Sequence, residues 1–172
     1  SVCDLLKAFE ADSTFSPFLT WPDLMNYCSY SANPVGRFLL ATVGLNAKIY
    51  GKDKAEFTEL SDKICTGLQL INFAQDIKED AENNRCYVPK CEWPESLEEN
   101  NMNSVLRLTG EKKNKLVMKL VAKGEQNLLT GSLLPNKIRK SNLRHAIRFS
   151  MEIALIIECG KNIIQQIKKD PS

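Results

Sequence analysis

Apolar residues recur every three or four positions along most of the chain, and no stretch alternates with a period of two for long. This pattern predicts an all-α protein, with helices over residues 2–11, 22–45, 53–81, 95–108, 111–129 and 143–168. Prolines, asparagines and glycines predict irregular segments at 83–94 and 131–141. The chain shows no internal repeat and no domain boundary, so residues 1–172 are expected to form a single domain.

Two sequence signals refine the helix predicted at 22–45. Thr20 is followed three residues later by Asp23, a pairing typical of a helix N-terminus. Pro34 lies inside the predicted helix, where it removes a backbone hydrogen bond. We therefore expect one helix with a kink at Pro34.

Composition and charge exclude several classes of protein. Hydrophobic residues make up 43% of the chain and charged residues 26%, and the net charge of +2 lacks the basic excess of a nucleic-acid-binding protein. The six cysteines have the spacing of neither a zinc site nor a disulfide framework, so we expect them to be reduced, which favours the cytoplasm. The most apolar segment, residues 151–167, is interrupted by charges and is too broken to span a bilayer. Lysine-rich runs at 112–115 and 137–140 are read as solvated helix ends, and a peripheral contact with the inner face of the membrane is left open.

A polar stripe crosses the otherwise apolar helix predicted at 53–81. Gln69, Asn72, Asp76 and Asp80 are spaced 3, 4 and 4 residues apart, and they fall within an arc of about 80° on a helix. Two carboxylates one turn apart repel each other, and a cation between them reverses the sign of that interaction. Mg²⁺ prefers oxygen ligands and commonly uses one or two carboxylates together with phosphate oxygens. The stripe therefore fits a Mg²⁺-bridged diphosphate, although a solvated helix surface is the simpler interpretation of the two aspartates alone.

The stripe is part of a longer motif. Residues 72–89 read N-x-x-x-D-x-x-x-D followed closely by R-x-Y-x-P, and residues 27–36 read Y-C-S-Y-S-A-N-P-V-G. Both motifs resemble those of the squalene/phytoene synthases. The S-A-N-P-V-G variant is similar to that of their hydroxysqualene synthase branch in the bacterial hopanoid pathway. The resemblance implies the all-helical fold of the isoprenoid synthases and Mg²⁺-dependent chemistry on a prenyl diphosphate.

The resemblance also implies roles for single residues. It assigns catalysis to Asp76, Asp80 and Tyr87, and metal binding to Asn72, Asp76 and Asp80. The residues that it assigns to substrate binding are Gln69, Asn72, Arg85, Tyr27, Ala32, Val35 and Gly36.

Without the resemblance, several of these residues have simpler interpretations. Arg85 offers a fork of donors to a diphosphate oxygen, but a salt bridge with a nearby glutamate is the alternative. Tyr87 could donate to a diphosphate or face a carbocation with its ring, but as a lone residue it is read as core. The expected kink at Pro34, with Ala32 and Gly36 beside it, either opens a helix wall to a polyisoprenoid chain or is a helix-packing notch.

The chain departs from the family pattern in three places. The glycine before Arg85 is replaced by Asn84, which can still adopt a left-handed turn. An Arg-Tyr pair is absent from the segment that reads Ser16-Pro17-Phe18. The first aspartate-rich motif is absent as well, because the resemblance covers only the C-terminal part of the family fold. We therefore expect a fragment that is inactive alone, with an apolar stripe exposed where an N-terminal half carrying that motif would pack.

The leading hypothesis follows from the hydroxysqualene synthase branch. It is the Mg²⁺-dependent ionisation of presqualene diphosphate and capture of the cation by water, which gives hydroxysqualene on the route to squalene and hopanoids. Head-to-head condensation of two prenyl diphosphates, to presqualene diphosphate or phytoene, is the first alternative. A non-catalytic assembly or scaffold protein is the second, and the presence of Asn72, Asp76 and Asp80 argues against it. This chemistry needs no histidine base, in keeping with the distance of His145 from both motifs.

Overall fold

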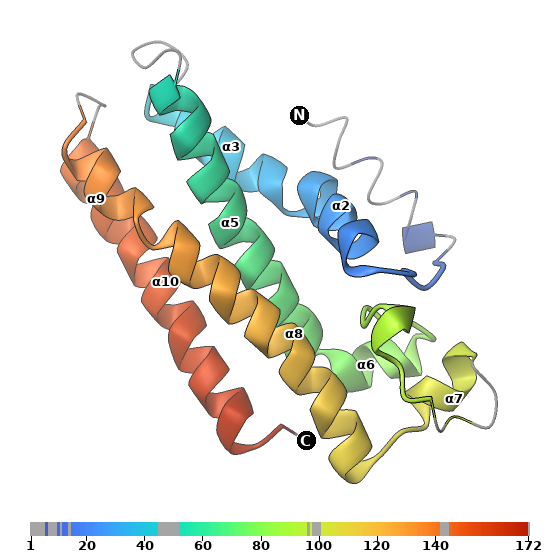
Figure 1. Cartoon of the computed structure of the whole chain (residues 1–172). Coiled ribbons are helices and arrows are strands. Elements are labelled where there is room, and N and C mark those ends of the chain that lie inside the picture. The colour runs from blue at the N-terminus through green and yellow to red at the C-terminus, as the bar shows by residue number, and fades with distance from the viewer. Residues whose placement is uncertain are drawn as a thin grey trace.

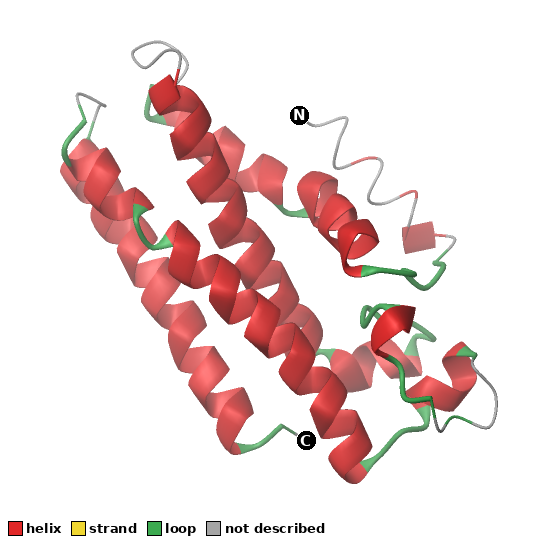
Figure 2. Cartoon of the chain, in the orientation of Figure 1, coloured by secondary structure: helices red, strands yellow, loops and turns green. Residues whose placement is uncertain are grey.

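The computed structural model of the chain describes residues 6, 10, 12–13, 15–44, 52–95, 97, 101–141 and 145–171. Within these ranges the protein consists of helices and loops without a strand, which confirms the predicted all-α class (Figure 2). Most of the helix predicted at 2–11 lies outside the described residues, but residues 6, 10, 12 and 13 are helical. The helices with defined bounds are α2 (Trp21–Ser31), α3 (Asn33–Thr42), α5 (Lys52–Gln75), α6 (Ile77–Glu82), the 3₁₀ turn η1 (Lys90–Glu92), α7 (Met102–Leu106), α8 (Gly110–Gly131), α9 (Leu134–Arg139) and α10 (Ala146–Lys169).

The helix predicted at 22–45 is two helices, α2 and α3, separated by Ala32. The Asp23 carboxylate accepts hydrogen bonds from the Thr20 N–H (2.9 Å) and the Thr20 hydroxyl (2.8 Å), so α2 begins as predicted. The prediction of one kinked helix was wrong. Pro34 lies in the first turn of α3, where its missing N–H is tolerated, whereas it could not continue α2.

The long helix predicted at 53–81 is also interrupted, at Asp76. α5 ends one residue earlier, and Asp76 has φ −89° and ψ 7°, outside the helical range. Hydrogen bonding continues across the break, because the Asp76 N–H donates to the Asn72 carbonyl (2.8 Å) and the Asp76 carbonyl accepts from the Asp80 N–H (2.7 Å). Asn72, Asp76 and Asp80 therefore remain one turn apart although the helix is not continuous.

Two further predictions were wrong. Residues 131–141 were predicted to be a loop, but Leu134–Arg139 form α9, with Pro135 in its first turn. Leu134 and Ile138, one turn apart, are both buried, and their burial favours this short helix. The helix predicted at 95–108 is confined to α7, and the described residues 95 and 97 before it are not helical. The predictions at 111–129 and 143–168 agree with α8 and with the described part of the last helix, α10.

α5 is the central helix of the protein. In Figure 1 it runs between α2 and α3 on one side and α8, α9 and α10 on the other. Its most extensive contacts are with α8. There Gly67 faces Gly124, and a Cβ on Gly67 would lie 2.9 Å from the Gly124 carbonyl oxygen. Glycine at these positions allows the two backbones to approach closely.

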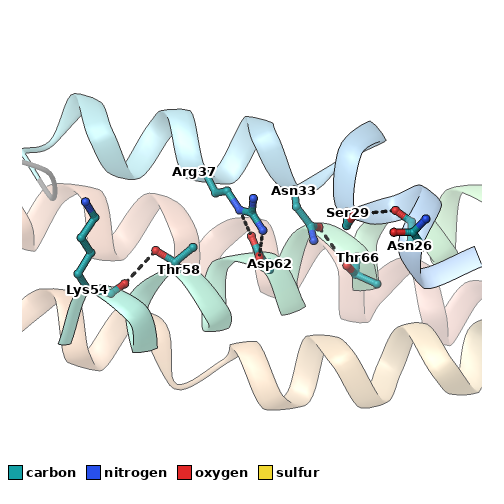
Figure 3. A network of polar contacts seen from close by, with 8 residues as sticks. All are labelled: Asn26, Ser29, Asn33, Arg37, Lys54, Thr58, Asp62 and Thr66. Atoms are coloured by element: carbon teal, nitrogen blue, oxygen red, sulfur yellow. Dashed lines mark hydrogen bonds and ion pairs between the residues drawn. The ribbon is translucent and has the colours of Figure 1, made fainter. Parts of the chain in front are cut away.

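Polar contacts hold α3 on α5 (Figure 3). The Arg37 guanidinium donates two hydrogen bonds to the Asp62 carboxylate, at 2.9 and 2.6 Å. One turn along each helix, the Thr66 hydroxyl donates to the side-chain oxygen of the buried Asn33 at 3.0 Å. A bidentate arginine–carboxylate pair fixes orientation as well as distance. These contacts therefore determine how α3 lies along α5.

α3 and α10 expose large apolar side chains. Phe38 on α3 and Met151 on α10 are each 67% exposed. Ile147 and Leu155, one turn to either side of Met151, are exposed to a similar degree. Contiguous apolar surface of this kind is uncommon on soluble monomers and marks contact surfaces. α10 thus carries an exposed apolar stripe as expected, and what packs against it stays a prediction.

The cysteines of the described residues are free thiols. Cys28 and Cys86 are buried, and burial raises the pKa of the Cys28 thiol to about 12 and that of Cys86 to about 11. Cys91 and Cys159, by contrast, are exposed. None of the helices in the described ranges has the length and apolar character needed to cross a membrane.

Candidate functional site

The residues of the polar stripe lie along the C-terminal part of α5 and in α6. Gln69 and Asp80 are half-buried, whereas Asn72 and Asp76 are exposed. We call Asp76 and Asp80 the carboxylate pair. The two carboxyl groups interact electrostatically across the helix break, so the break preserves the pair that the sequence predicted.

Burial raises the pKa of Asp80 from 3.8 to about 6. Desolvation is the largest cause, and the negative charge of Asp76 is the second. The positive charge of Arg85 opposes both and lowers the pKa. Ionising Asp80 therefore costs more than ionising a solvated carboxyl group, and a cation at the carboxylate pair would relieve the repulsion.

A tight turn after α6 brings Arg85 back toward Asp80. Asn84 has φ 57°, which is the left-handed conformation predicted for this position. The Arg85 N–H donates to the Asp80 carbonyl (2.8 Å) and the Asn84 N–H to the Ala81 carbonyl (3.0 Å), the two bonds of a Schellman motif. The Arg85 guanidinium donates to the backbone carbonyl of Asp12 at 3.2 Å. Among the described residues, it forms none of the salt bridges with α6 glutamates that were the alternative interpretation.

Six aromatic side chains form a cluster beside these charges. They are Phe15, Phe18, Tyr27, Tyr30, Phe73 and Tyr87, which come from the loop before α2, from α2, from α5 and from the segment after α6. Tyr87 stacks on Phe73 with ring centroids 3.9 Å apart, and its ring lies 6.0 Å from that of Tyr27. Tyr27 and Tyr87 are both buried. The ring of Tyr87 is therefore part of the core, as the simpler interpretation of this residue expected. Burial raises the pKa of both phenols, and the Asp12 carboxylate raises them further.

Asp12 also belongs to this region, although it lies outside both sequence motifs. Its carboxylate accepts a hydrogen bond from the Tyr27 hydroxyl at 2.8 Å. It precedes Tyr27 by 15 residues and Arg85 by 73. No helical spacing connects these three residues, and only the tertiary fold brings them together.

An apolar groove of about 180 Å³ lies further along α5, between α3, α9 and α10. Val35 and Gly36 of α3, Leu68 of α5 and Phe149 of α10 are among the residues that line it. The two α3 residues belong to those predicted to bind substrate, and the lining is suited to an apolar chain rather than to a charged group.

Gly36 also allows two helices to pack closely, which was the alternative interpretation of this motif. A Cβ at this position would lie 2.6 Å from the Cys65 Sγ, so the glycine lets α3 approach α5. Ala32 is buried and is not among the residues that line the groove. The motif at 27–36 therefore contributes to two places, because Tyr27 belongs to the aromatic cluster and its last two residues belong to the groove.

The sequence prediction is that Gln69, Asn72, Asp76 and Asp80 face one cavity, with Arg85 and Tyr87 nearby. A cavity of about 390 Å³ lies between α6, α7 and the start of α8, and Arg85 lines it. The carboxylate pair does not line this cavity, and Asn72 and Asp76 are exposed instead. Asp80 interacts electrostatically with Asp76, Arg85 and Tyr87, and the meeting of these residues around one cavity stays a prediction.

Comparison with known proteins identifies the family. The model of the squalene/phytoene synthase family matches residues 1–164. The chain belongs to the squalene/phytoene synthase family. It is similar to a hydroxysqualene synthase from Sinorhizobium fredii, with 32% identity over 175 residues that cover 98% of this chain and 53% of that protein. A hydroxysqualene synthase from Zymomonas mobilis is 40% identical over 87 residues, which cover 50% of this chain and 27% of that protein.

A solved structure of this squalene/phytoene synthase family shows the same fold. The squalene synthase HpnC from Alicyclobacillus acidocaldarius matches with a TM-score of 0.78 and 26% sequence identity, over 98% of this chain and 59% of that one. This match confirms the predicted isoprenoid-synthase fold. The chain spans about half the length, or less, of the curated relatives that it matches.

The side chains of this squalene/phytoene synthase member fit Mg²⁺. Within the described residues, no group of three or more histidine, cysteine, aspartate and glutamate side chains could hold a metal by itself. The carboxylate pair nevertheless offers two carboxylates, and Asn72 offers an amide oxygen one turn earlier. Mg²⁺ keeps several waters and completes its shell with substrate phosphates, so two carboxylates suit it, whereas a structural zinc site needs four protein ligands. Desolvation is the main cause of the raised pKa of Asp80, and the repulsion from Asp76 that adds to it is of the kind that a divalent cation removes.

Proposed function

We propose that this chain supplies one carboxylate pair of a Mg²⁺-dependent prenyl diphosphate site, and that the reaction is conversion of presqualene diphosphate to hydroxysqualene. The observation that carries the proposal is that one face of α5 lines an apolar groove and, further along the helix, continues into the polar stripe. Ser61, Cys65, Leu68 and Asn72 are spaced 4, 3 and 4 residues apart, so they lie within about 60° of one another around the helix. The first three line the apolar groove, and the carboxylate pair follows Asn72 in the sequence.

A molecule with an anionic head and a long apolar tail fits this face. Cys65 in the groove and Asn72 in the polar stripe are about 10 Å apart along the helix, at 1.5 Å per residue. A diphosphate bound at the carboxylate pair would place its polyisoprenoid chain along the groove. Three apolar residues that line the groove, Val35, Leu39 and Ile156, are themselves 51%, 41% and 43% exposed, so the groove opens onto apolar surface.

The residues of the chain have different roles in this chemistry. Asp76 and Asp80, with Asn72, would hold Mg²⁺, which when bound neutralises the leaving diphosphate. Arg85 would donate to diphosphate oxygens, since its guanidinium carries five N–H donors. The C–O bond of the ester breaks, and its electron pair leaves with the diphosphate. The oxygen of a water molecule then bonds to the carbocation and loses a proton, which gives the alcohol.

The aromatic cluster suits the carbocation. Aromatic rings attract cations through their faces, and Tyr87, which stacks on Phe73, interacts with Asp80 and Arg85 of the site. Apolar walls limit the water that reaches a reactive cation. The hydroxysqualene synthase that matches nearly the whole chain supports capture of the cation by water, whereas a phytoene synthase that matches half of the chain keeps condensation as the alternative.

Binding can be tested on the chain itself by calorimetry with Mg²⁺ and inorganic diphosphate. We expect diphosphate binding that requires Mg²⁺ and is lost in Asp76→Asn. Glu59→Gln, which removes an exposed carboxylate from the same helix, is the matched control and should bind as the wild type does. Binding that is independent of Mg²⁺, or that is unchanged in Asp76→Asn, would show that the carboxylate pair is not a metal site.

The reaction can be tested in a chimera in which this chain replaces the matching part of the Sinorhizobium fredii enzyme. With presqualene diphosphate and Mg²⁺, the chimera should release diphosphate and form hydroxysqualene, with oxygen from labelled water in the hydroxyl group. Consumption of farnesyl diphosphate to give presqualene diphosphate would favour the condensation reaction instead. A folded chimera that turns over neither substrate would favour the non-catalytic scaffold.

A further inference from the structure

One residue of the N-terminal segment contacts both the aromatic cluster and the arginine of the site. The Asp12 carboxylate accepts a hydrogen bond from the Tyr27 hydroxyl at 2.8 Å, and the Asp12 backbone carbonyl accepts from the Arg85 guanidinium at 3.2 Å. Tyr27 is only 4% exposed and Asp12 is half-buried, so water competes weakly for the first of these bonds. Asp12 thus connects α2 to the turn after α6.

We propose that Asp12 is a positioning residue of the diphosphate site: its carboxylate fixes the Tyr27 hydroxyl, and its backbone carbonyl fixes the Arg85 guanidinium. The inference rests on the proposed function for what the site binds. The two contacts themselves exist in the protein without a ligand.

The carboxylate of Asp12 determines what Tyr27 can do. A phenol hydroxyl has one proton to donate, and Asp12 accepts it. Tyr27 therefore presents its ring and its oxygen lone pairs to the site, and it is not a proton donor to a diphosphate. The electrostatics agree, because the hydrogen bond to Asp12 is second only to desolvation in raising the pKa of Tyr27, which keeps the phenol neutral.

The backbone carbonyl of Asp12 acts on Arg85. It holds one of the five donors of the guanidinium, and the charge of Arg85 in turn acts on Asp80 and lowers its pKa. A side chain that is already held loses less conformational freedom when a ligand binds. Asp12 therefore holds both Tyr27 of the aromatic cluster and the Arg85 guanidinium in place.

The contact with Tyr27 can be tested in the whole chain by NMR, with the four tyrosines labelled with ¹³C at the ζ carbon. The spectrum of Tyr27→Phe assigns the Tyr27 signal. Asp12→Ala removes the acceptor and should shift the Tyr27 signal, whereas Asp12→Asn keeps an acceptor oxygen and should leave it close to its wild-type position. Glu10→Gln, at an exposed acid two residues earlier, is the matched control and should shift nothing. A Tyr27 signal that is the same in Asp12→Ala and the wild type would overturn the proposal.

The effect on the site can be measured as the affinity for inorganic diphosphate in the presence of Mg²⁺. Asp12→Ala should weaken binding by about tenfold, as expected for loss of one charge-assisted hydrogen bond. Asp12→Asn should recover most of this loss, and Asp12→Ala should add nothing further to Tyr27→Phe. Equal losses in Asp12→Asn and Asp12→Ala would show that the charge acts rather than the hydrogen bond, and would overturn the positioning role. If neither the wild-type chain nor the chimera binds diphosphate, the proposed function fails, and the tyrosine signals still decide whether Asp12 positions Tyr27.

Discussion

Replacing Asp80 by asparagine should stabilise the metal-free protein at neutral pH. Folding raises the pKa of Asp80 from 3.8 to about 6. The folded state therefore holds this proton more tightly than the unfolded chain, and the stability that it confers is present below about pH 4 and lost as the pH rises through about 6. A difference of about two pKa units corresponds to about 3 kcal/mol. Because Asp80 is only half-buried, water screens its charge, and we expect Asp80→Asn to gain about 1 kcal/mol above neutral pH.

Urea denaturation followed by circular dichroism measures the free energy of unfolding of the two proteins. The advantage of Asp80→Asn should shrink toward zero as the pH falls to about 4, where the wild-type carboxyl group becomes protonated in both states. Glu59→Gln is again the control and should change stability little. Adding Mg²⁺ and diphosphate should stabilise the wild type and not Asp80→Asn, since a ligand of the folded state raises its stability. A difference in stability that does not depend on pH would refute the reasoning.

Two further predictions concern packing. Gly36→Val should lower the melting temperature, because even a Cβ there would lie 2.6 Å from the Cys65 Sγ and overpacking costs about 1–3 kcal/mol. The Ser61 Oγ would lie closer still, so Ser61→Ala together with Cys65→Ala should restore part of that loss in the triple variant, and no recovery would contradict these contacts. Phe38→Ser combined with Met151→Ser should reduce the fluorescence of a bound hydrophobic dye without changing the circular dichroism, because both side chains are largely exposed. Unchanged dye fluorescence would mean that these residues of α3 and α10 do not form the accessible apolar surface.

Hydrophobic periodicity predicted the long helices and failed on short ones. α8 and α10 contain 22 and 24 residues, so a buried position every third or fourth residue is repeated often enough to be recognised. α9 has six residues, and its two buried positions are too few to show a period. Pro135 was read as a sign of a loop, but a proline in the first turn of a helix leaves every needed hydrogen bond intact.

The candidate site was predictable as far as it depends on local spacing. Asp76 and Asp80 remain one turn apart although the helix breaks at Asp76, because the hydrogen bonds across the break keep the helical spacing. The left-handed turn at Asn84 was predictable for a similar reason, since it depends on one residue and its neighbours. The contact of Asp12 with Tyr27 was not predictable, because it depends on how two segments meet in the folded protein.

The polar stripe of α5 can be substituted without loss of the fold, because it lies on a different side of the helix from the contact with α8. Gly67, where α5 meets α8 most closely, lies about 140° around the helix from Asn72. A Cβ on Gly67 would meet the α8 backbone, so substitutions on that side act on the core. Asn72 and Asp76 are exposed, and substituting them removes no core contact. A loss of diphosphate binding in stripe variants can therefore be attributed to the site, provided that their unfolding free energies match or exceed that of the wild type.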